Sequence, residues 1–441
     1  MELSHCRSFL LVLGISSAFL FWGLMMSLQP PFYPSEAEKK GATPLEVRIY
    51  LNSKEYTYLL FKLFMQYGCV FGAYYLAAFL FSPLTSKCGG CLGPKTLCIL
   101  GAIFQAVSAI LFGFLKYTDD KIIFIGMSYF LRFLSGIAEA AAWTASITIL
   151  MTAFPTRMTT MMAWTEMSFG VGSCFGPSLG AFLYEIGGFC FPFWTVGTLA
   201  FVQSLLLIIV VPTIEPSTKE PTKDNSNILT VKKAMLTPSI FVPFMDLFVS
   251  YLGYGMITSM LEEYLDNEIS VTEQQIGLTF TCLGLVYMVS SLSCGVLCDK
   301  LQRPGLLSIL SNAVLAIAFT FLGPVIFMPI EPTFLSTTIS ASLMGMGFGI
   351  AVVTSFRRAQ KAVIGLGFKE DWNTYMTICS TWSTVFYLSN VIGPSLAGGL
   401  VESFGFRVAS TAFPFMYVLN GFINLIELLK HSRNEHYEPL E

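Results

Sequence analysis

Residues 176–189 read GPSLGAFLYEIGGF, and residues 393–406 read GPSLAGGLVESFGF. The two stretches align without a gap at a constant offset of 217 residues, and eight of their fourteen positions are identical. Each copy lies at the end of a long apolar run. Two Gly- and Pro-rich helix ends can also converge on similar sequences, but duplication of one six-helix unit accounts for both copies at once. The repeat therefore predicts a chain built from two related halves.

Apolar runs of membrane-spanning length extend along the whole chain. Of the 441 residues, 54% are hydrophobic and 12% are charged, and the mean hydropathy is +0.66. Soluble domains contain about 25% charged residues, so the composition excludes a soluble globular enzyme. A helix that crosses a bilayer needs about 20 apolar residues. This criterion predicts an all-α integral membrane protein with twelve transmembrane helices in two pseudo-symmetric six-helix halves, with spans at 9–29, 66–84, 96–115, 122–150, 158–184, 189–212, 239–265, 274–298, 305–328, 333–359, 373–401 and 407–430.

The polar segments between the spans predict the domains and the orientation. The longest polar segment, 213–238, lies between the sixth and seventh spans and reads as a linker. It separates an N-terminal half, 1–212, from a C-terminal half, 239–430, and a tail follows at 431–441. Sixteen Lys and Arg residues lie on the side of the termini and eight on the opposite side. The positive-inside rule therefore predicts that the termini, linker and tail are cytosolic.

Charge and histidine content exclude several classes of function. The net charge is −3, so there is no basic surface for nucleic acid. His5, His431 and His436 all lie outside the spans, which excludes a His-based metal site or proton relay inside the membrane. The sequence contains no Ser/His/Asp arrangement and no phosphate-binding Gly loop followed by Lys. We expect no metal, no cofactor, no nucleic-acid partner and no enzymatic activity.

Charged residues inside the spans are candidates for function, because each costs several kcal/mol to bury in a bilayer. Arg132 needs an acidic partner. Glu139 lies about 10 Å further along the same helix, and Glu166 lies in the next span, so geometry favours Glu166. We expect Glu166 to carry a proton, with a purely structural ion pair as the alternative. Glu139 is the candidate for binding a cationic amine, with Trp143 adding a cation–π contact.

The C-terminal half contains further charged candidates. Asp246 and Glu262 lie in the seventh span. Carboxylates spaced along one cavity, such as Glu166 and Glu262, would suit a substrate with two separated amines. Tyr254 and Tyr387 are candidates for aromatic contact. Three basic residues at the end of the tenth span are interpreted as positive-inside anchors and not as a substrate site: Arg357, Arg358 and Lys361.

The fifth span carries the motif Gly170-x-Gly172-x-x-x-Gly176-Pro177-x-x-Gly180. The eleventh span repeats its glycine and proline as Gly393 and Pro394. Small residues one turn apart let two helices approach closely, and Pro177 removes a helix hydrogen bond. This motif resembles the antiporter motif of the major facilitator superfamily, and the resemblance extends over essentially the whole chain. It implies two six-helix halves that open a central cavity alternately to either side, and it favours exchange over one-way transport.

Two further motifs are similar to those of the superfamily. Arg132-x-x-x-Gly136 in the fourth span resembles a motif that is tied to proton coupling. Gly295-Val-Leu-Cys-Asp299-Lys300, after the eighth span, resembles the loop motif that braces the cytosolic gate. The resemblance implies a gating role for Gly295 and Asp299, with a helix-end cap as the alternative for Asp299. The stretch Ser82–Cys91, after the second span, departs from the motif because it lacks the Asp.

More narrowly, the chain resembles the vesicular amine transporter family and its polyamine-transporting branch. Four stretches carry this resemblance: Pro31–Ala42, Thr144-Ala-Ser146, Tyr184-Glu185 and Leu261-Glu262. The resemblance implies loading of polyamines into acidic vesicles in exchange for protons. Monoamine carriers of the family are expected to have an Asp in the first span, whereas residues 9–28 contain no acidic residue. This difference favours polyamines over monoamines.

The expected partners are a small cationic substrate, protons and the lipid bilayer. We expect a monomer in an acidic secretory, synaptic or lysosomal vesicle membrane, or else in the plasma membrane. Residues 45–65 are expected to be an insertion in the first lumenal loop, because the family has a short loop there. Two alternatives remain open: an exporter of drugs or other amphiphiles, and a non-transporting sensor on the same fold. The costly charges inside the spans argue against the sensor.

Overall fold

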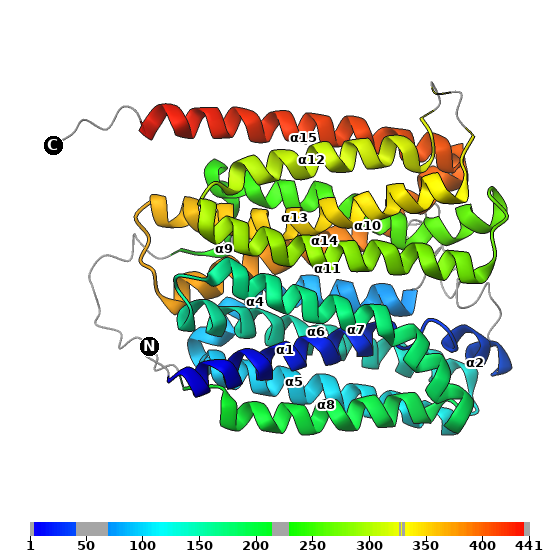
Figure 1. Ribbon diagram of the computed structural model, residues 1–441. Helices are drawn as coiled ribbons and strands as arrows, with labels where there is room; N and C mark the ends of the chain where they lie inside the picture. Colours follow the sequence, from blue (N-terminus) through cyan, green and yellow to red (C-terminus); the bar gives the residue numbers. More distant parts are fainter. Residues whose placement is uncertain (1–3, 41–68, 214–228, 326–327, 329–330, 436–441) are drawn as a thin grey trace, which may run out of the picture. The chain divides into compact units, whose positions relative to one another are not determined.

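The computed structural model describes residues 4–40, 69–213, 229–325, 328 and 331–435, and all regular structure in these residues is helical. Twelve of the helices have at least 19 residues (Figure 1): α1 (His5–Ser27), α4 (Cys69–Leu92), α5 (Pro94–Gly113), α6 (Lys121–Ala153), α7 (Met158–Gly187), α8 (Cys190–Val210), α10 (Pro238–Asn267), α11 (Glu273–Leu301), α12 (Pro304–Leu322), α13 (Phe334–Gly365), α14 (Trp372–Phe404) and α15 (Phe406–Glu435). Within the described ranges, three short helices lie between them: α2 (Tyr33–Lys39), η1 (Phe114–Tyr117) and α9 (Val231–Leu236).

Each predicted apolar run corresponds to one long helix, which confirms the all-α class. Among the described residues, ten helices are long and apolar enough to cross a membrane. The other two long helices are α4 and α7. The strong agreement follows from the physics of the bilayer, because a spanning helix must present about 20 apolar residues in one continuous stretch.

The second helix differs from the prediction. α4 extends to Leu92, so the stretch Ser82–Cys91, interpreted as a loop, is helical. Only Gly93, whose φ is +81°, separates α4 from α5, and this left-handed conformation suits glycine. Pro83 lies inside α4, where a proline does not end the helix. The suspected insertion at 45–65 lies outside the described residues.

The chain divides into two compact units. Unit 1 consists of Met1–Val231 and Lys369–Val391, and unit 2 consists of Lys232–Phe368 and Ile392–Glu441. The first part of α14 therefore belongs to unit 1 and its last part to unit 2. The predicted domain boundaries, which place all of α14 in the C-terminal half, stay a prediction.

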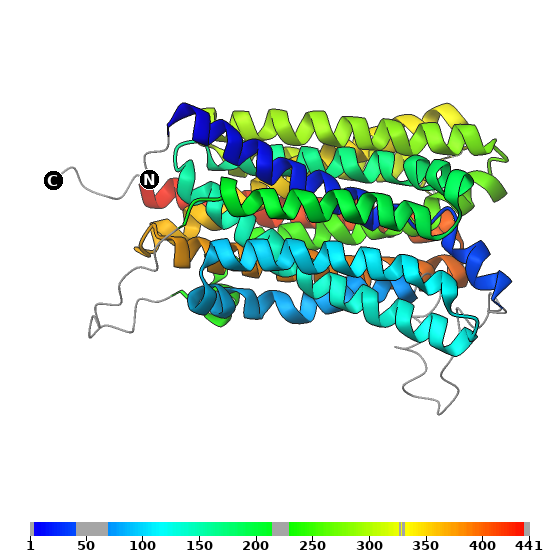
Figure 2. The same cartoon turned by 90° about the horizontal axis from the view of Figure 1, so that it is seen from below.

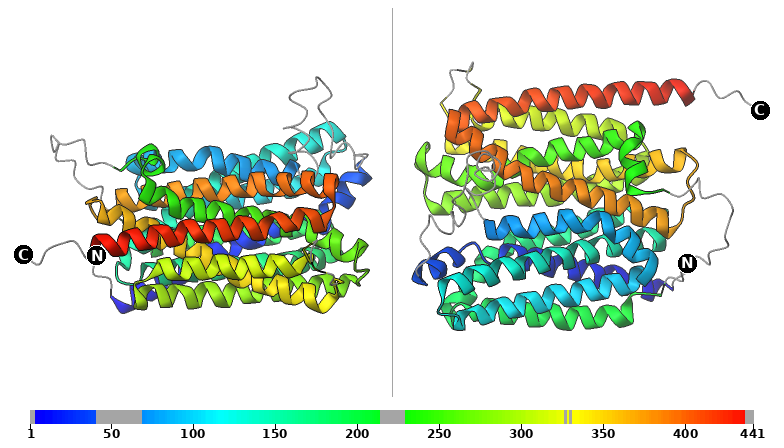
Figure 3. Two further views of the ribbon diagram at one scale, coloured as in Figure 1. Left: turned by 90° about the horizontal axis from the view of Figure 1, so that it is seen from above. Right: turned by 180° about the vertical axis from the view of Figure 1, so that it is seen from behind.

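Corresponding helices pack together within each unit. In unit 1, α4 and α5 pack on α6, and α8 packs on α5 and α1. Figure 2 shows α5 and α8 running side by side. In unit 2, α11 and α12 pack on α13, and α15 packs on α12 and α10. Figure 3 shows α15 against α12. In each predicted half, the second and third long helices therefore pack on the fourth, and the sixth packs on the third and the first. This correspondence is what the sequence repeat predicts.

The segment after α1 is held against unit 1 by aromatic and basic side chains. Phe32 stacks on Tyr184 of α7 with ring centroids 5.0 Å apart. Lys39 Nζ donates to the Tyr184 hydroxyl at 2.8 Å, and this contact and Glu36 raise the pKa of Lys39. Lys40 Nζ donates to the Thr118 carbonyl at 2.7 Å. These contacts fix α2 beside the ends of α5 and α7.

The glycines of the fifth-span motif face α1. A Cβ added at Gly172 would clash with the carbonyl oxygen of Leu20, and one at Gly180 would clash with that of Leu28. A Cβ at Gly176 would clash with the Ser27 hydroxyl. The motif therefore lets the backbones of α1 and α7 lie in direct contact.

Gly172→Ala is expected to destabilise the protein by about 1–3 kcal/mol, because the new methyl group overlaps backbone that cannot move aside cheaply. The matched control is Gly126→Ala in α6, where an added Cβ meets nothing within 4 Å. Thermal unfolding of the detergent-solubilised full chain measures both. Equal melting temperatures for the two variants would show that the α1–α7 contact is looser than the structure indicates.

Candidate functional site

Glu139 lies at the centre of a buried polar cluster in unit 1. It sits on α6 and is 2% exposed. Gln105 Nε2 of α5 donates to Glu139 Oε2 at 2.8 Å, and the Tyr387 hydroxyl of α14 donates to Oε1 at 3.5 Å. Both partners are neutral, so neither balances the charge of an ionised carboxylate. A buried carboxylate with this surrounding is suited to binding a cation.

Aromatic rings pack around two neighbours of Glu139: Trp143, which follows it on α6, and Tyr387, which donates to it. Trp143, one turn after Glu139, contacts Phe19 of α1 and Phe169 of α7 with centroid distances of 4.5 and 5.4 Å. Phe386 of α14 stacks against Trp143 at 6.3 Å. Tyr75 of α4 lies 6.4 Å from the ring of Tyr387. Ring faces carry negative potential, so this environment favours cations. Trp143 is only 2% exposed, and its surface is occupied by these neighbouring rings.

Glu166 lies on α7 and is also 2% exposed. The Tyr387 hydroxyl contacts the other buried carboxylate, Glu139. Both predicted carboxylates are therefore buried within unit 1. The sequence prediction named Tyr387 only as a candidate for aromatic contact, and its hydroxyl contact with Glu139 joins positions 248 residues apart.

Two aromatic rings lie close to Arg132. Its guanidinium lies 5.9 Å from the ring centroids of Tyr74 in α4 and Phe112 in α5. A Cβ at Gly136 would clash with the Tyr74 carbonyl oxygen, so this glycine lets α6 approach α4 beside the arginine. Arg132 also lines a small cavity of about 20 Å³ that Gln29 borders, large enough for about one water molecule. The expected pairing of Arg132 with Glu166 stays a prediction.

The remaining predicted site residues lie in unit 2. Glu262 is exposed near the end of α10. Gly295 is buried in α11, and Asp299 lies in the last turn of that helix. Gly393 and Pro394 lie within α14, and a Cβ at Gly255 of α10 would come within 2.7 Å of the Pro394 ring. The gating roles of these residues stay predictions.

Basic side chains of α13 hold the turn after Asp299. Gln302, with a left-handed φ of 54°, ends α11. Arg357 Nη2 donates to Gln302 Oε1 at 3.0 Å, and Lys361 Nζ donates to the Gln302 carbonyl at 2.5 Å. These two residues were interpreted as membrane anchors, and the structure adds that they fix the α11–α12 turn.

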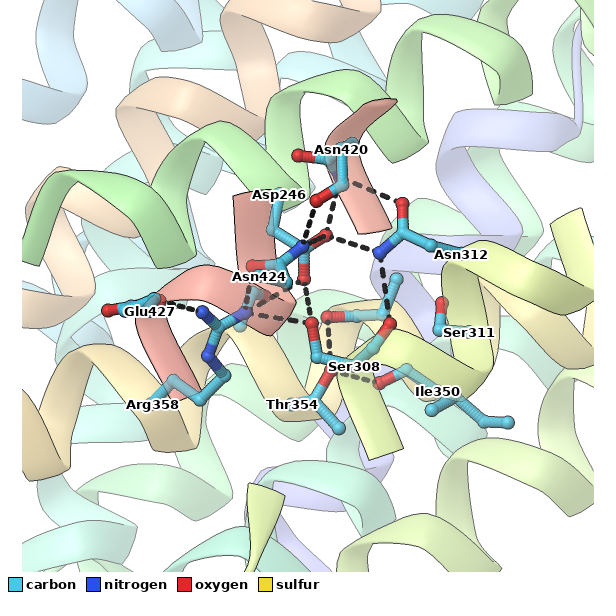
Figure 4. Close-up of polar contacts among 12 residues, drawn as sticks. Asp246, Ser308, Ser311, Asn312, Ile350, Thr354, Arg358, Asn420, Asn424 and Glu427 are labelled. Carbon is cyan, nitrogen blue, oxygen red and sulfur yellow. Dashed lines mark hydrogen bonds and ion pairs between the residues drawn. The ribbon is translucent and has the colours of Figure 1, made fainter. Parts of the chain in front are cut away.

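The interpretation of Arg358 as an anchor was wrong. Its side chain is 8% exposed and forms an ion pair with Asp246 at 3.4 Å and another with Glu427. Figure 4 shows that Asn420 and Asn424 of α15 also point into this cluster. In sequence, a basic residue near the end of a span resembles a membrane anchor. The pattern that could have indicated a buried role for Arg358 lies in its partners: Asp246 inside one span, and two asparagines spaced by one helical turn inside another.

Comparison with known proteins agrees with this architecture. The model of the Major Facilitator Superfamily matches residues 10–368 and, in an overlapping second match, 247–439. The mouse (Mus musculus) MFS-type transporter SLC18B1 is 28% identical over 424 residues, which cover 95% of this chain and 86% of the mouse protein. The mouse synaptic vesicular amine transporter is 22% identical over 259 residues, 58% of this chain and 45% of that protein. These relatives confirm the resemblance to vesicular amine transporters.

Among solved structures, the human organic anion transporter MFSD10 (TETRAN) aligns with a TM-score of 0.66 at 18% identity. The alignment covers 96% of this chain and 100% of that chain, and at this identity it shows the fold alone. The predicted fold class is thereby confirmed, and the prediction of a transporter and not an enzyme holds. With its family model matched along nearly the whole sequence, this multi-pass membrane chain belongs to the Major Facilitator Superfamily of transporters.

Proposed function

We propose that the protein is an antiporter that exchanges protons for organic cations, with polyamines such as spermidine and spermine as its substrates. The observation that carries this proposal is the buried Glu139 carboxylate, whose hydrogen-bond donors Gln105 and Tyr387 are neutral. A cationic amine would supply the missing positive charge. The resemblance to SLC18B1 and to synaptic vesicular amine transporters supports an amine substrate.

Two carboxylates in unit 1 give the exchange a physical basis. Glu139 binds the amine beside the aromatic rings, and Glu166 carries the proton. Both carboxylates are buried in the same unit, where charges are poorly screened, so a charge bound at one alters the electrostatic field at the other. In an alternating-access cycle, protonation of Glu166 would favour release of the cation from Glu139. The acidic interior of a vesicle is then the compartment in which the amine is released.

A competition assay tests the substrate class. The full chain is reconstituted in liposomes, and uptake of radiolabelled spermidine is measured with excess unlabelled spermine, serotonin or the hydrophobic cation rhodamine. We expect spermine to compete most strongly, because it shares with spermidine the separated cationic amines that would pair with buried carboxylates. Stronger competition by serotonin would indicate a monoamine carrier, and stronger competition by rhodamine would indicate the alternative drug exporter.

Tyr387→Phe is expected to raise the KM for spermidine roughly two- to fivefold with little change in maximal rate, because it removes one long hydrogen bond to Glu139 and keeps the ring. Initial uptake rates over a range of spermidine concentrations measure this. Tyr264→Phe is the matched control, since among the described residues the buried Tyr264 hydroxyl has no hydrogen-bond partner. Equal KM values in Tyr387→Phe and wild type would remove Tyr387 from the site.

A further inference from the structure

Unit 2 contains a buried polar network that the proposed transport cycle does not use. The network consists of one residue of α10, two of α12, one of α13 and three of α15: Asp246, Ser308, Asn312, Arg358, Asn420, Asn424 and Glu427 (Figure 4). Asp246, Ser308 and Arg358 are at most 8% exposed. Four helices of the unit thus meet around one carboxylate.

Hydrogen-bond donors surround both oxygens of Asp246. Oδ1 accepts from the amide nitrogens of Asn312 and Asn420 at 2.7 Å each, and from that of Asn424 at 3.0 Å. Oδ2 accepts from the Ser308 hydroxyl at 2.5 Å and from Arg358 Nη1 at 3.4 Å. An ionised carboxylate offers about four acceptor positions, so these donors occupy them all. The arrangement fits an ionised carboxylate.

The asparagine amides cannot flip to present their oxygens as hydrogen-bond acceptors to a protonated Asp246. Arg358 Nη1 donates to Asn424 Oδ1 at 2.6 Å, which fixes the orientation of that amide. Asn420 Nδ2 also donates to Asn312 Oδ1 at 2.8 Å, which fixes the amide of Asn312. Asn312 and Asn424 thus each accept a second hydrogen bond on the amide oxygen, and Asn420 donates a second one from its amide nitrogen. These bonds hold all three amide nitrogens toward the Asp246 carboxylate.

Arg358 connects Asp246 to a second carboxylate. Its Nη1 donates to the Ser308 hydroxyl at 2.8 Å, and its Nη2 is paired with Glu427. The Glu427 side chain is 16% exposed, whereas Asp246 is fully buried. The titratable groups of the network, taken over all four helices, are one arginine and two carboxylates. Removal of the arginine would therefore leave both carboxylates without the cation that pairs with them.

We infer that Asp246 and Arg358 form a fixed ion pair that holds α10, α12, α13 and α15 as one rigid body and that takes no part in proton transfer. Such a pair acts as a positioning element. Alternating access requires helices of one half to move together, and a fully bonded network joins four of them at one point. Removing one member of a buried pair strands the charge of the other, whereas removing both does not.

A double-mutant cycle tests the ion pair without any substrate. We expect Arg358→Gln to lower the melting temperature of the detergent-solubilised full chain most, by roughly 5–10 °C. The double variant Asp246→Asn with Arg358→Gln is expected to melt above Arg358→Gln alone. Glu427→Gln is the matched control, because Arg358 keeps Asp246 as its partner and the shift should be smallest. Additive losses in the double variant would overturn the ion pair.

The pH dependence of transport tests the second half of the inference. Glu427→Gln and the double variant are expected to show a lower maximal rate of spermidine uptake with the wild-type pH profile. A profile that flattens or moves in either variant would place the network in the proton path and overturn the fixed role. This readout rests on the proposed function. If wild type transports no spermidine, that failure is separate, because the melting-temperature cycle still decides whether the ion pair exists.

Discussion

Glu139→Gln is expected to reduce spermidine uptake by about 30-fold or more. The amide keeps the shape of the side chain and its position between Gln105 and Tyr387, but it removes the negative charge that the bound amine would pair with. Loss of one member of a buried, hydrogen-bonded charge pair costs about 2–5 kcal/mol, and each 1.4 kcal/mol is a factor of ten. Initial rates in proteoliposomes at several spermidine concentrations measure the loss.

The matched control for this variant is Glu262→Gln, which neutralises an exposed carboxylate near the end of α10. Its uptake should stay within about twofold of wild type, since exposed charges contribute little. If Glu262→Gln were the more damaging change, the amine site would lie at that end of α10 and not at Glu139. Wild-type uptake by Glu139→Gln would likewise remove Glu139 from the site.

Glu166→Gln is expected to uncouple transport from the proton gradient. The amide cannot take up or release a proton, so uptake should no longer rise when the liposome interior is acidified. Exchange of internal unlabelled spermidine for external label should continue, because Glu139 and its neighbours remain intact. The two assays together separate coupling from binding. A Glu166→Gln protein that still responds fully to the gradient would assign the proton to another group.

The helices could be predicted from the sequence because the signal for a transmembrane span is local. Twenty consecutive apolar residues define it, and the ends of α7, α10 and α14 lie within three residues of the predicted ends. The end of α4 was missed by eight residues, because Pro83 and the glycines that follow it resemble a break. Within a bilayer, neighbouring side chains satisfy the backbone around a proline, so the helix continues.

The candidate site could be predicted only in part. A carboxylate inside a span is visible in the sequence, so Glu139 and Glu166 were identified from their cost of burial. Their partners were not, since Gln105 and Tyr387 are ordinary residues until packing brings them to Glu139. The role of Arg358 was missed for the same reason, because its seven-residue network comes from four separate helices. Long-range contacts of this kind have no local pattern.

Gradient-driven uptake tests the central claim most directly. Purified full-length protein in liposomes with an acidic interior is mixed with radiolabelled spermidine, and uptake is compared with liposomes that have no pH difference. The proton-coupled antiporter predicts accumulation that requires the gradient, collapses when a protonophore is added, and is lost in Glu139→Gln. Accumulation that is equal with and without the gradient, or absent in protein shown to be folded by its melting temperature, would contradict a proton/polyamine antiporter.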